Sequence, residues 1–176
     1  MSRDLSTPAA ERSPASILIV DDEEALRATL VTAFTLEGYR AVGAGSAREA
    51  LQRLQQAPCD VLLVDLRMPD IDGIQLMERV RERTPDTLVI LMTGGATVES
   101  AVRALKGGAY DYILKPFSLP EIFRVVERGL EQQRLKQENV QLNELNRRLQ
   151  EIDQIKSNLL SAITHEFRTP LTVMSG

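Results

Sequence analysis

Short apolar segments alternate with amphipathic segments from Ser16 to about Glu127, and this alternation constrains the fold more than any other feature. Three of the five apolar segments carry no polar residue, which is typical of parallel strands buried on both faces. Between them, apolar residues recur at helical spacing. The pattern predicts an α/β fold, a doubly wound five-stranded parallel sheet. Its strands are expected at residues 17–20, 39–42, 61–64, 88–92 and 110–113.

Three of the expected helices carry recognisable start signals. Ser46 with Glu49, and Ser118 with Glu121, fit the capping box, in which a hydroxyl and a carboxylate bind the first free N–H groups. Asp22 precedes two glutamates and is expected to cap the first helix.

Composition excludes several classes of protein. The chain has 21 Lys+Arg against 25 Asp+Glu, a net charge of −4, and so lacks the basic excess of nucleic-acid-binding domains. Its longest apolar run, residues 88–92, is far too short to span a membrane. Cys59 is the only cysteine and cannot form an internal disulfide, which suits a reducing compartment. We expect a cytoplasmic protein with no membrane segment and no nucleic-acid partner.

The chain has a different character before and after the α/β pattern. Residues 1–15 are polar and aperiodic, and they are expected to form a disordered leader. Residues 132–160 are predicted to form one helix. From Leu142 onward, apolar residues recur every three or four positions, with one missing step at Ile152–Ile155, and this stripe extends beyond the range to Ile163. So narrow a stripe predicts a coiled-coil signalling helix that forms a homodimer. The alternative, a helix folded back on the α/β domain, is disfavoured by the charges around the stripe.

Chemically capable residues stand where the expected strands end: Asp21 and Asp22, Asp65, Thr93 and Lys115. Each alone has an ordinary explanation as a cap, a turn residue or a surface lysine. In a parallel sheet, however, all of them meet at one edge. Three clustered carboxylates require a cation, and all-oxygen ligands favour Mg²⁺.

A divalent cation beside an aspartate is explained if that aspartate becomes phosphorylated. The cation neutralises the phosphoryl oxygens while the carboxylate attacks phosphorus in line. Lys115 would hold a second phosphoryl oxygen as a point charge, and the Thr93 hydroxyl would hydrogen-bond a third.

Over residues 16–131 these positions resemble the receiver domain of two-component response regulators. The resemblance rests on Asp21-Asp22, on Asp65 followed by Met68-Pro69-Asp70-Ile71-Asp72-Gly73, on Met92-Thr93-Gly94, and on Tyr112-x-x-Lys115-Pro116-Phe117. It implies a flavodoxin-like fold in which Asp65 accepts phosphate from a histidine kinase or a phosphotransfer protein.

The same resemblance implies further roles. Asp22, Asp65 and the Arg67 backbone carbonyl would bind Mg²⁺, with Asp21 acting largely through water. Thr93 and Tyr112 would form a switch pair that responds to the phosphate. Lys115 and Pro116 would be joined by a cis peptide bond.

Residues 161–171, around the single histidine His165, resemble the phosphoacceptor box of histidine kinases. A zinc-protease motif is excluded, because the fifth position from His165 holds Thr169 rather than histidine. The resemblance implies that His165 takes the γ-phosphate of ATP with Glu166 as general base, although Phe167 stands where leucine or isoleucine is commoner. Residues 161–176 would then be a truncated phosphoacceptor helix, which Pro170 is expected to kink.

These features together lead us to expect part of a hybrid histidine kinase, in which phosphorylation of Asp65 regulates a kinase module bearing His165. Neither glycine-rich stretch fits a nucleotide-binding motif, so this chain alone is not expected to bind ATP. One alternative is a free-standing response regulator whose helical tail mediates dimerisation or partner binding. Another, a Mg²⁺-dependent α/β phosphatase, requires Asp-x-Asp at the first strand, where this chain has Asp21-Asp22.

Overall fold

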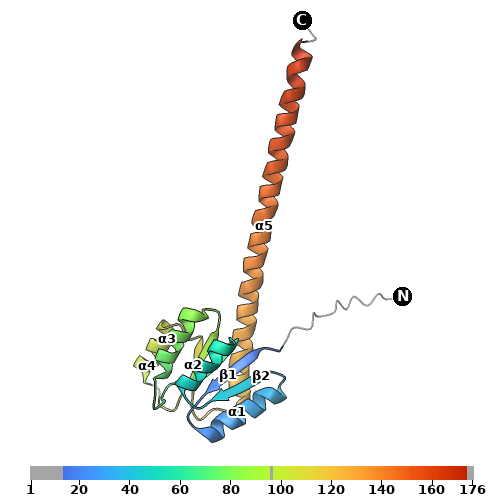
Figure 1. Ribbon diagram of the computed structural model, residues 1–176. Coiled ribbons are helices and arrows are strands. Elements are labelled where there is room, and N and C mark those ends of the chain that lie inside the picture. Colours follow the sequence, from blue (N-terminus) through green and yellow to red (C-terminus); the bar gives the residue numbers. More distant parts are fainter. Residues whose placement is uncertain (1–13, 96, 174–176) are drawn as a thin grey trace, which may run out of the picture. The chain divides into compact units, whose positions relative to one another are not determined.

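The computed structural model describes residues 14–95 and 97–173, which divide after Leu130 into two units (Figure 1). Five strands alternate with five helices, and α5 continues from the first unit into the second. The elements are β1 Ser16–Val20, α1 Glu24–Leu36, β2 Arg40–Ala44, α2 Ala47–Gln56, β3 Val61–Asp65, α3 Gly73–Arg83, β4 Leu88–Thr93, α4 Val98–Lys106, β5 Asp111–Leu114 and α5 Leu119–Val173.

The first unit contains one parallel sheet with strand order β2-β1-β3-β4-β5. The predicted doubly wound α/β fold is therefore confirmed. Neighbouring strands are aligned so that Val20 lies beside Val64, and Asp65 beside Met92. Because all strands run the same way, the residues that follow them gather at one edge of the sheet, where ligands bind in open α/β folds.

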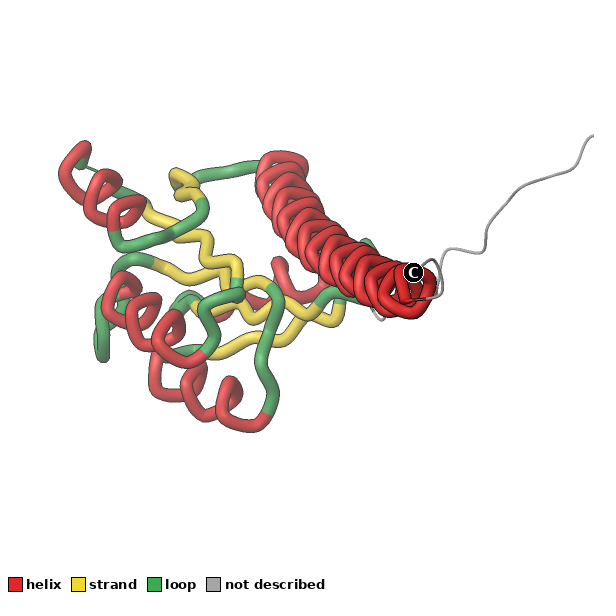
Figure 2. Tube along the Cα trace, turned by 90° about the horizontal axis from the view of Figure 1, so that it is seen from above, coloured by secondary structure: helices red, strands yellow, loops and turns green. Residues whose placement is uncertain are grey.

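The sheet is covered on both faces, and Figure 2 shows the strands lying between helices. One face packs against α1 and the start of α5 through residues such as Leu30, Phe34 and Ile122. The other packs against α2, α3 and α4 through residues such as Ala50, Met77 and Ala104. Strands β3 and β4 are buried along their whole length, which explains why the sequence shows them as continuous apolar runs.

Helix starts agree with the sequence only in part. Ser46 caps α2 as predicted, its Oγ accepting from the Glu49 N–H at 3.2 Å. The Glu49 carboxylate, however, accepts from the Gly45 N–H at 2.8 Å and not from that of Ser46. The predicted Asp22 cap of α1 is wrong, because Glu23 is the N-cap residue. The physical reason is that Asp21 Oδ1 accepts from the Glu23 N–H at 2.9 Å, which holds this segment in a turn and delays the helix by one residue.

The second unit is helical as far as it is described, to Val173. Its apolar stripe is exposed: Leu142, Leu145, Leu149, Ile152, Ile155, Leu159 and Ile163 are each 49–62% accessible. Its charged residues pair within the helix, as Arg147 does with Glu144 at 3.0 Å and Glu151 at 2.9 Å. The helix continues through Pro170, where the sequence predicts a kink, to Val173. No helix among the described residues is long and apolar enough to cross a membrane.

The predicted leader lies almost entirely outside the described residues, which begin at Pro14. The division after Leu130 falls within α5. The first part of this helix packs on the sheet, and its later part carries the exposed stripe.

Candidate functional site

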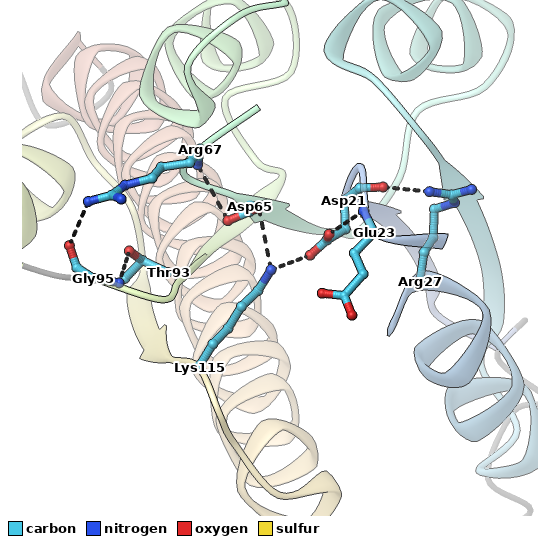
Figure 3. Close-up of polar contacts among 8 residues, drawn as sticks. All are labelled: Asp21, Glu23, Arg27, Asp65, Arg67, Thr93, Gly95 and Lys115. Carbon is cyan, nitrogen blue, oxygen red and sulfur yellow. Dashed lines mark hydrogen bonds and ion pairs between the residues drawn. The ribbon is translucent and has the colours of Figure 1, made fainter. Parts of the chain in front are cut away.

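Four predicted site residues lie together at the carboxyl edge of the sheet (Figure 3). Asp21 follows β1, Asp65 and Thr93 are the last residues of β3 and β4, and Lys115 follows β5. The parallel topology alone brings these side chains together, although they are up to 94 positions apart in the chain.

Three carboxylates form the acidic part of the site. Asp21, Asp22 and Asp65 each offer an oxygen, and these oxygens all lie within 4.8 Å of one another. Asp21 is 0% exposed and Asp65 is 7% exposed, while Asp22 faces solvent. A cluster of carboxylate oxygens that is open to water on one side is the kind of donor set that Mg²⁺ takes, so the residues present fit this ion.

Lys115 supplies the positive charge of the site. Its Nζ lies 2.6 Å from Asp21 Oδ2 and 3.3 Å from Asp65 Oδ2 (Figure 3). Burial works to lower the pKa of Lys115, but the hydrogen bond and charge of Asp21 and the charge of Asp65 outweigh it and raise the pKa. The Lys115–Pro116 peptide bond is cis, as the resemblance implies.

Asp65 is less acidic than an ordinary aspartate. Burial raises its pKa, the charge of Lys115 opposes this, and the charge of Asp21 raises it further. Its carboxylate accepts one long backbone bond, from the Arg67 N–H to Oδ1 at 3.4 Å. The chain therefore holds a carboxylate at the site in an environment that favours loss of its negative charge.

Thr93 and Tyr112 lie on the neighbouring strands β4 and β5. Leu91 is aligned with Tyr112 and Thr93 with Leu114, so Thr93 and Tyr112 point to the same face of the sheet, two positions apart. Thr93 is 2% exposed and its Oγ1 accepts from the Gly95 N–H at 3.3 Å. Tyr112 is half-buried against the core on the α2–α4 side.

The loop of residues 66–72 follows Asp65 and closes on itself at its base. The Gly73 N–H donates to the Leu66 carbonyl at 3.0 Å. A Cβ at Gly73 would lie 2.4 Å from the Asp65 carbonyl oxygen, so only glycine allows this close approach. Arg67, whose backbone carbonyl is the predicted fourth metal ligand, also donates from Nη2 to the Gly95 carbonyl at 3.4 Å.

Sequence reasoning missed Arg27. This residue of α1 donates from Nη1 to the Asp21 backbone carbonyl at 2.6 Å, and so holds the segment that carries two of the carboxylates (Figure 3). Its position six residues after Asp21 puts it near the start of α1, but an arginine on an amphipathic helix gives no signal of such a contact.

His165 and Glu166 belong to the second unit and are exposed on α5. The structure therefore brings together the residues predicted at the sheet edge, while the predicted histidine phosphoacceptor belongs to the second unit.

Comparison with known proteins agrees with this geometry. The family model described as "Response regulator receiver domain" matches residues 17–127. The regulatory protein AtoC of Escherichia coli strain K12 is 47% identical over 122 residues, which are 69% of this chain and 26% of that protein. The chain thus spans about a quarter of this relative, and the likeness gives no support for an attached histidine kinase domain.

Solved structures share the fold. The CheY-like receiver protein of Methanospirillum hungatei superposes with a TM-score of 0.68 at 31% identity, over 70% of this chain and 99% of that one. The beryllofluoride-activated NtrC4 receiver domain dimer gives a TM-score of 0.64 at 35% identity, over 67% of this chain and 98% of that one. With its family model matched over most of its length, the chain belongs to the response regulator receiver domain family.

Proposed function

We propose that this chain is the receiver portion of a response regulator, and that Asp65 accepts a phosphoryl group from a phosphohistidine donor in a Mg²⁺-dependent reaction. The observation that supports this best is the arrangement of Asp65, Asp21 and Lys115, in which one lysine lies within 3.3 Å of both buried carboxylates.

The transfer step follows from these residues. An oxygen of Asp65 attacks phosphorus, the bond between phosphorus and the donor imidazole nitrogen breaks, and its electron pair returns to that nitrogen, which takes up a proton. Asp21, Asp22, Asp65 and the Arg67 carbonyl would hold Mg²⁺, which supplies positive charge to the phosphoryl oxygens. Lys115 would bind another phosphoryl oxygen once Asp65 is an acyl phosphate, because the Asp65 carboxylate has then lost the charge that attracts the lysine.

Thr93 and Tyr112 are proposed as the switch pair. The Thr93 hydroxyl is buried beside the site and would donate to a phosphoryl oxygen. Since Tyr112 lies on the same face of the sheet, a movement of Thr93 changes the space open to its ring.

Site mapping tests this proposal. The chain is treated with acetyl phosphate and Mg²⁺, the acyl phosphate is reduced with borohydride, and the peptide that contains homoserine is identified. Homoserine at position 65, and no labelling of Asp65→Asn, is the expected result. Asp60→Asn, a change in an exposed aspartate before β3, serves as the matched control and should label normally. Labelling elsewhere would contradict the proposal.

The helical tail is proposed to form a homodimer through its exposed apolar stripe. Supporting this, the side chains between Leu142 and Ile163 that would be buried by a second copy are about half exposed, while nearby arginines already pair with glutamates of the same helix. Residues 132–160 would then act as a coiled-coil linker, and the expected cytoplasmic location suits this regulatory role.

A hybrid kinase remains the second candidate, carried by the sequence around His165, whose side chain and that of Glu166 are exposed on α5. The relative reported above favours the response regulator. Incubation of this chain with a histidine kinase catalytic domain and ATP, followed by a test for phosphate on His165, distinguishes the two candidates. Acid-labile, base-stable phosphate on His165 would support the kinase, and its absence would leave the response regulator.

A further inference from the structure

Two loops carry the acidic residues of the site, and both are hydrogen-bonded to the same short stretch of chain, at the junction of β2 and α2. One is the segment 21–23 after β1, and the other is the loop 66–72 after β3. The stretch that joins them comprises residues 44–49, which link β2 to α2.

The loop 66–72 is hydrogen-bonded to α2 through Asp70. Its base is closed by the bond between Gly73 and Leu66, and Asp72 Oδ1 caps the following helix by accepting from the Ile74 N–H at 2.8 Å. At the tip, Asp70 Oδ2 accepts from the Arg48 N–H at 3.1 Å. A carboxylate from one loop thus occupies the free N–H groups of another helix, where a negative charge is favoured.

Electrostatics agrees with this attachment. Burial acts against the charged form of Asp70, but hydrogen bonds from the N–H groups of Arg48, Ala47 and Ile71 outweigh it and lower the pKa. Asp70 is therefore held as a carboxylate by the first turn of α2 and by its own loop.

The segment after β1 is bonded to the same stretch at one point and is held by α1 at another. The Asp21 N–H donates to the Ala44 carbonyl at 3.2 Å, and Arg27 Nη1 donates to the Asp21 carbonyl at 2.6 Å. The Arg27 side chain crosses β2 in close contact, since a Cβ at Gly43 would lie 2.9 Å from Arg27 Cγ and one at Gly45 would lie 3.4 Å from Nη1.

The stretch 44–49 is itself rigidly placed. Ser46 caps α2, and Glu49 Oε2 accepts from the Gly45 N–H at 2.8 Å. Ala47 and Ala50 are both 0% exposed, so the first turn of α2 is packed directly on the sheet. A segment that is held by the core and bonded to both loops fixes the separation of those loops.

We propose that residues 44–49, at the junction of β2 and α2, are a clamp that holds the two acidic loops at the spacing needed for Mg²⁺, with Asp70 and Arg27 as positioning residues. This inference rests on the proposed function, because it concerns the same metal site. Asp70 bonds to the N–H groups of α2 and of its own loop. It acts through the loop that carries the Arg67 carbonyl, three residues before it in the chain.

The test compares Asp70→Ala with Ser46→Ala in the full chain. Both variants remove an acceptor from the N-terminus of α2, and both are expected to lower Tm modestly. Only Asp70→Ala also releases the loop 66–72. Mg²⁺ affinity, measured by titration calorimetry, should fall about tenfold in Asp70→Ala and change by less than about twofold in Ser46→Ala.

Hydrogen exchange of the amides in residues 66–72 gives a second readout that needs no metal. Exchange should become faster in Asp70→Ala and stay as in the parent chain in Ser46→Ala. Asp70→Asn keeps an acceptor oxygen and should restore most of both properties. Arg27→Met keeps the aliphatic contact with Gly43 but loses the bond to Asp21, so its Mg²⁺ affinity should fall several-fold.

The outcomes separate this inference from the proposed function. If the parent chain binds no Mg²⁺, the proposed function fails. In that case, amide hydrogen exchange in residues 66–72 that is slow in the parent and fast in Asp70→Ala would still show that Asp70 holds this loop against α2. If Mg²⁺ affinity is equal in Asp70→Ala and Ser46→Ala, or if neither variant changes exchange, the clamp is wrong.

Discussion

The two units of this chain use the same kinds of residue in opposite ways. In the first unit, leucines such as Leu30 and Leu62 are 0% exposed, whereas Leu149 in the second unit is 55% exposed. In the first unit, Lys115 joins two buried carboxylates across the sheet, whereas Arg147 pairs with exposed glutamates on its own helix. The first unit thus has a core and a charged site, while the second has an exposed apolar stripe.

The largest expected difference is between the same substitution in the two units. Leu30→Ala should lower the free energy of unfolding of the receiver by about 2–5 kcal/mol, because it leaves a cavity among fully buried side chains. Leu149→Ala should leave the unfolding of the receiver unchanged. Urea denaturation followed by circular dichroism at low protein concentration measures both. Equal destabilisation by the two variants would remove the contrast on which the comparison rests.

A charge placed in the apolar stripe of the second unit tests whether this stripe forms the proposed dimer interface. Leu149→Glu should weaken dimerisation about 100-fold, because a buried carboxylate without a partner is strongly disfavoured in a helix interface. Gln150→Glu adds the same charge one residue away, off the stripe, and should leave the dimer intact. Sedimentation equilibrium measures both dissociation constants. A parent chain that stays monomeric at high concentration would refute the dimer itself.

The ion pairs of Lys115 in the first unit and of Arg147 in the second should differ in how much they stabilise the fold. Lys115→Met should cost about 1–3 kcal/mol at pH 7, because it leaves Asp21 and Asp65 without their cation. Since the pKa of Lys115 is raised above 10.5, its stabilising effect is complete at neutral pH and is lost only as pH rises through that raised value. Arg147→Met, on the exposed helix, should leave the unfolding free energy unchanged within error. Denaturation of the two variants at pH 7 decides the point, and equal losses would show that burial does not separate these pairs.

The smallest effect concerns Asp65 and pH. A raised pKa means that the folded chain holds the Asp65 proton more tightly than the unfolded chain, so ionisation of Asp65 costs stability. This cost is present at neutral pH and disappears as pH falls toward the ordinary value of 3.8. Asp65→Asn should therefore raise Tm at pH 7, with a gain that shrinks as pH is lowered. A gain that grows on acidification would mean that the direction of the pKa shift is wrong.

The fold could be predicted because its strands are read directly from the sequence. Strands β3 and β4 are buried on both faces and therefore consist of uninterrupted apolar residues, and parallel topology then places Asp65 and Thr93 at one edge. The Asp22 cap could not be foreseen, since a side-chain bond from Asp21 to Glu23 decided where α1 begins.

Hydrogen bonds that join one element or loop to another could not be predicted either. The bond from Arg27 to the Asp21 carbonyl and that from Arg48 to Asp70 join residues 6 and 22 positions apart. Neither has a periodic signal, because both depend on how loops meet once the sheet has formed. The hybrid kinase is predicted from the coiled-coil stripe and the His165 motif behind the receiver pattern, and the relative and structures reported above favour a response regulator instead.

The central claim is that Asp65, held beside Asp21, Asp22 and Lys115, is a Mg²⁺-dependent phosphoacceptor. Its most direct test is intact mass spectrometry of the chain after incubation with a purified phosphohistidine donor, with Mg²⁺ or with EDTA. We predict the gain of one phosphoryl group with Mg²⁺, little gain in EDTA, and none in Asp65→Asn. Equal gains with Mg²⁺ and EDTA, or an undiminished gain in Asp65→Asn, would contradict this assignment.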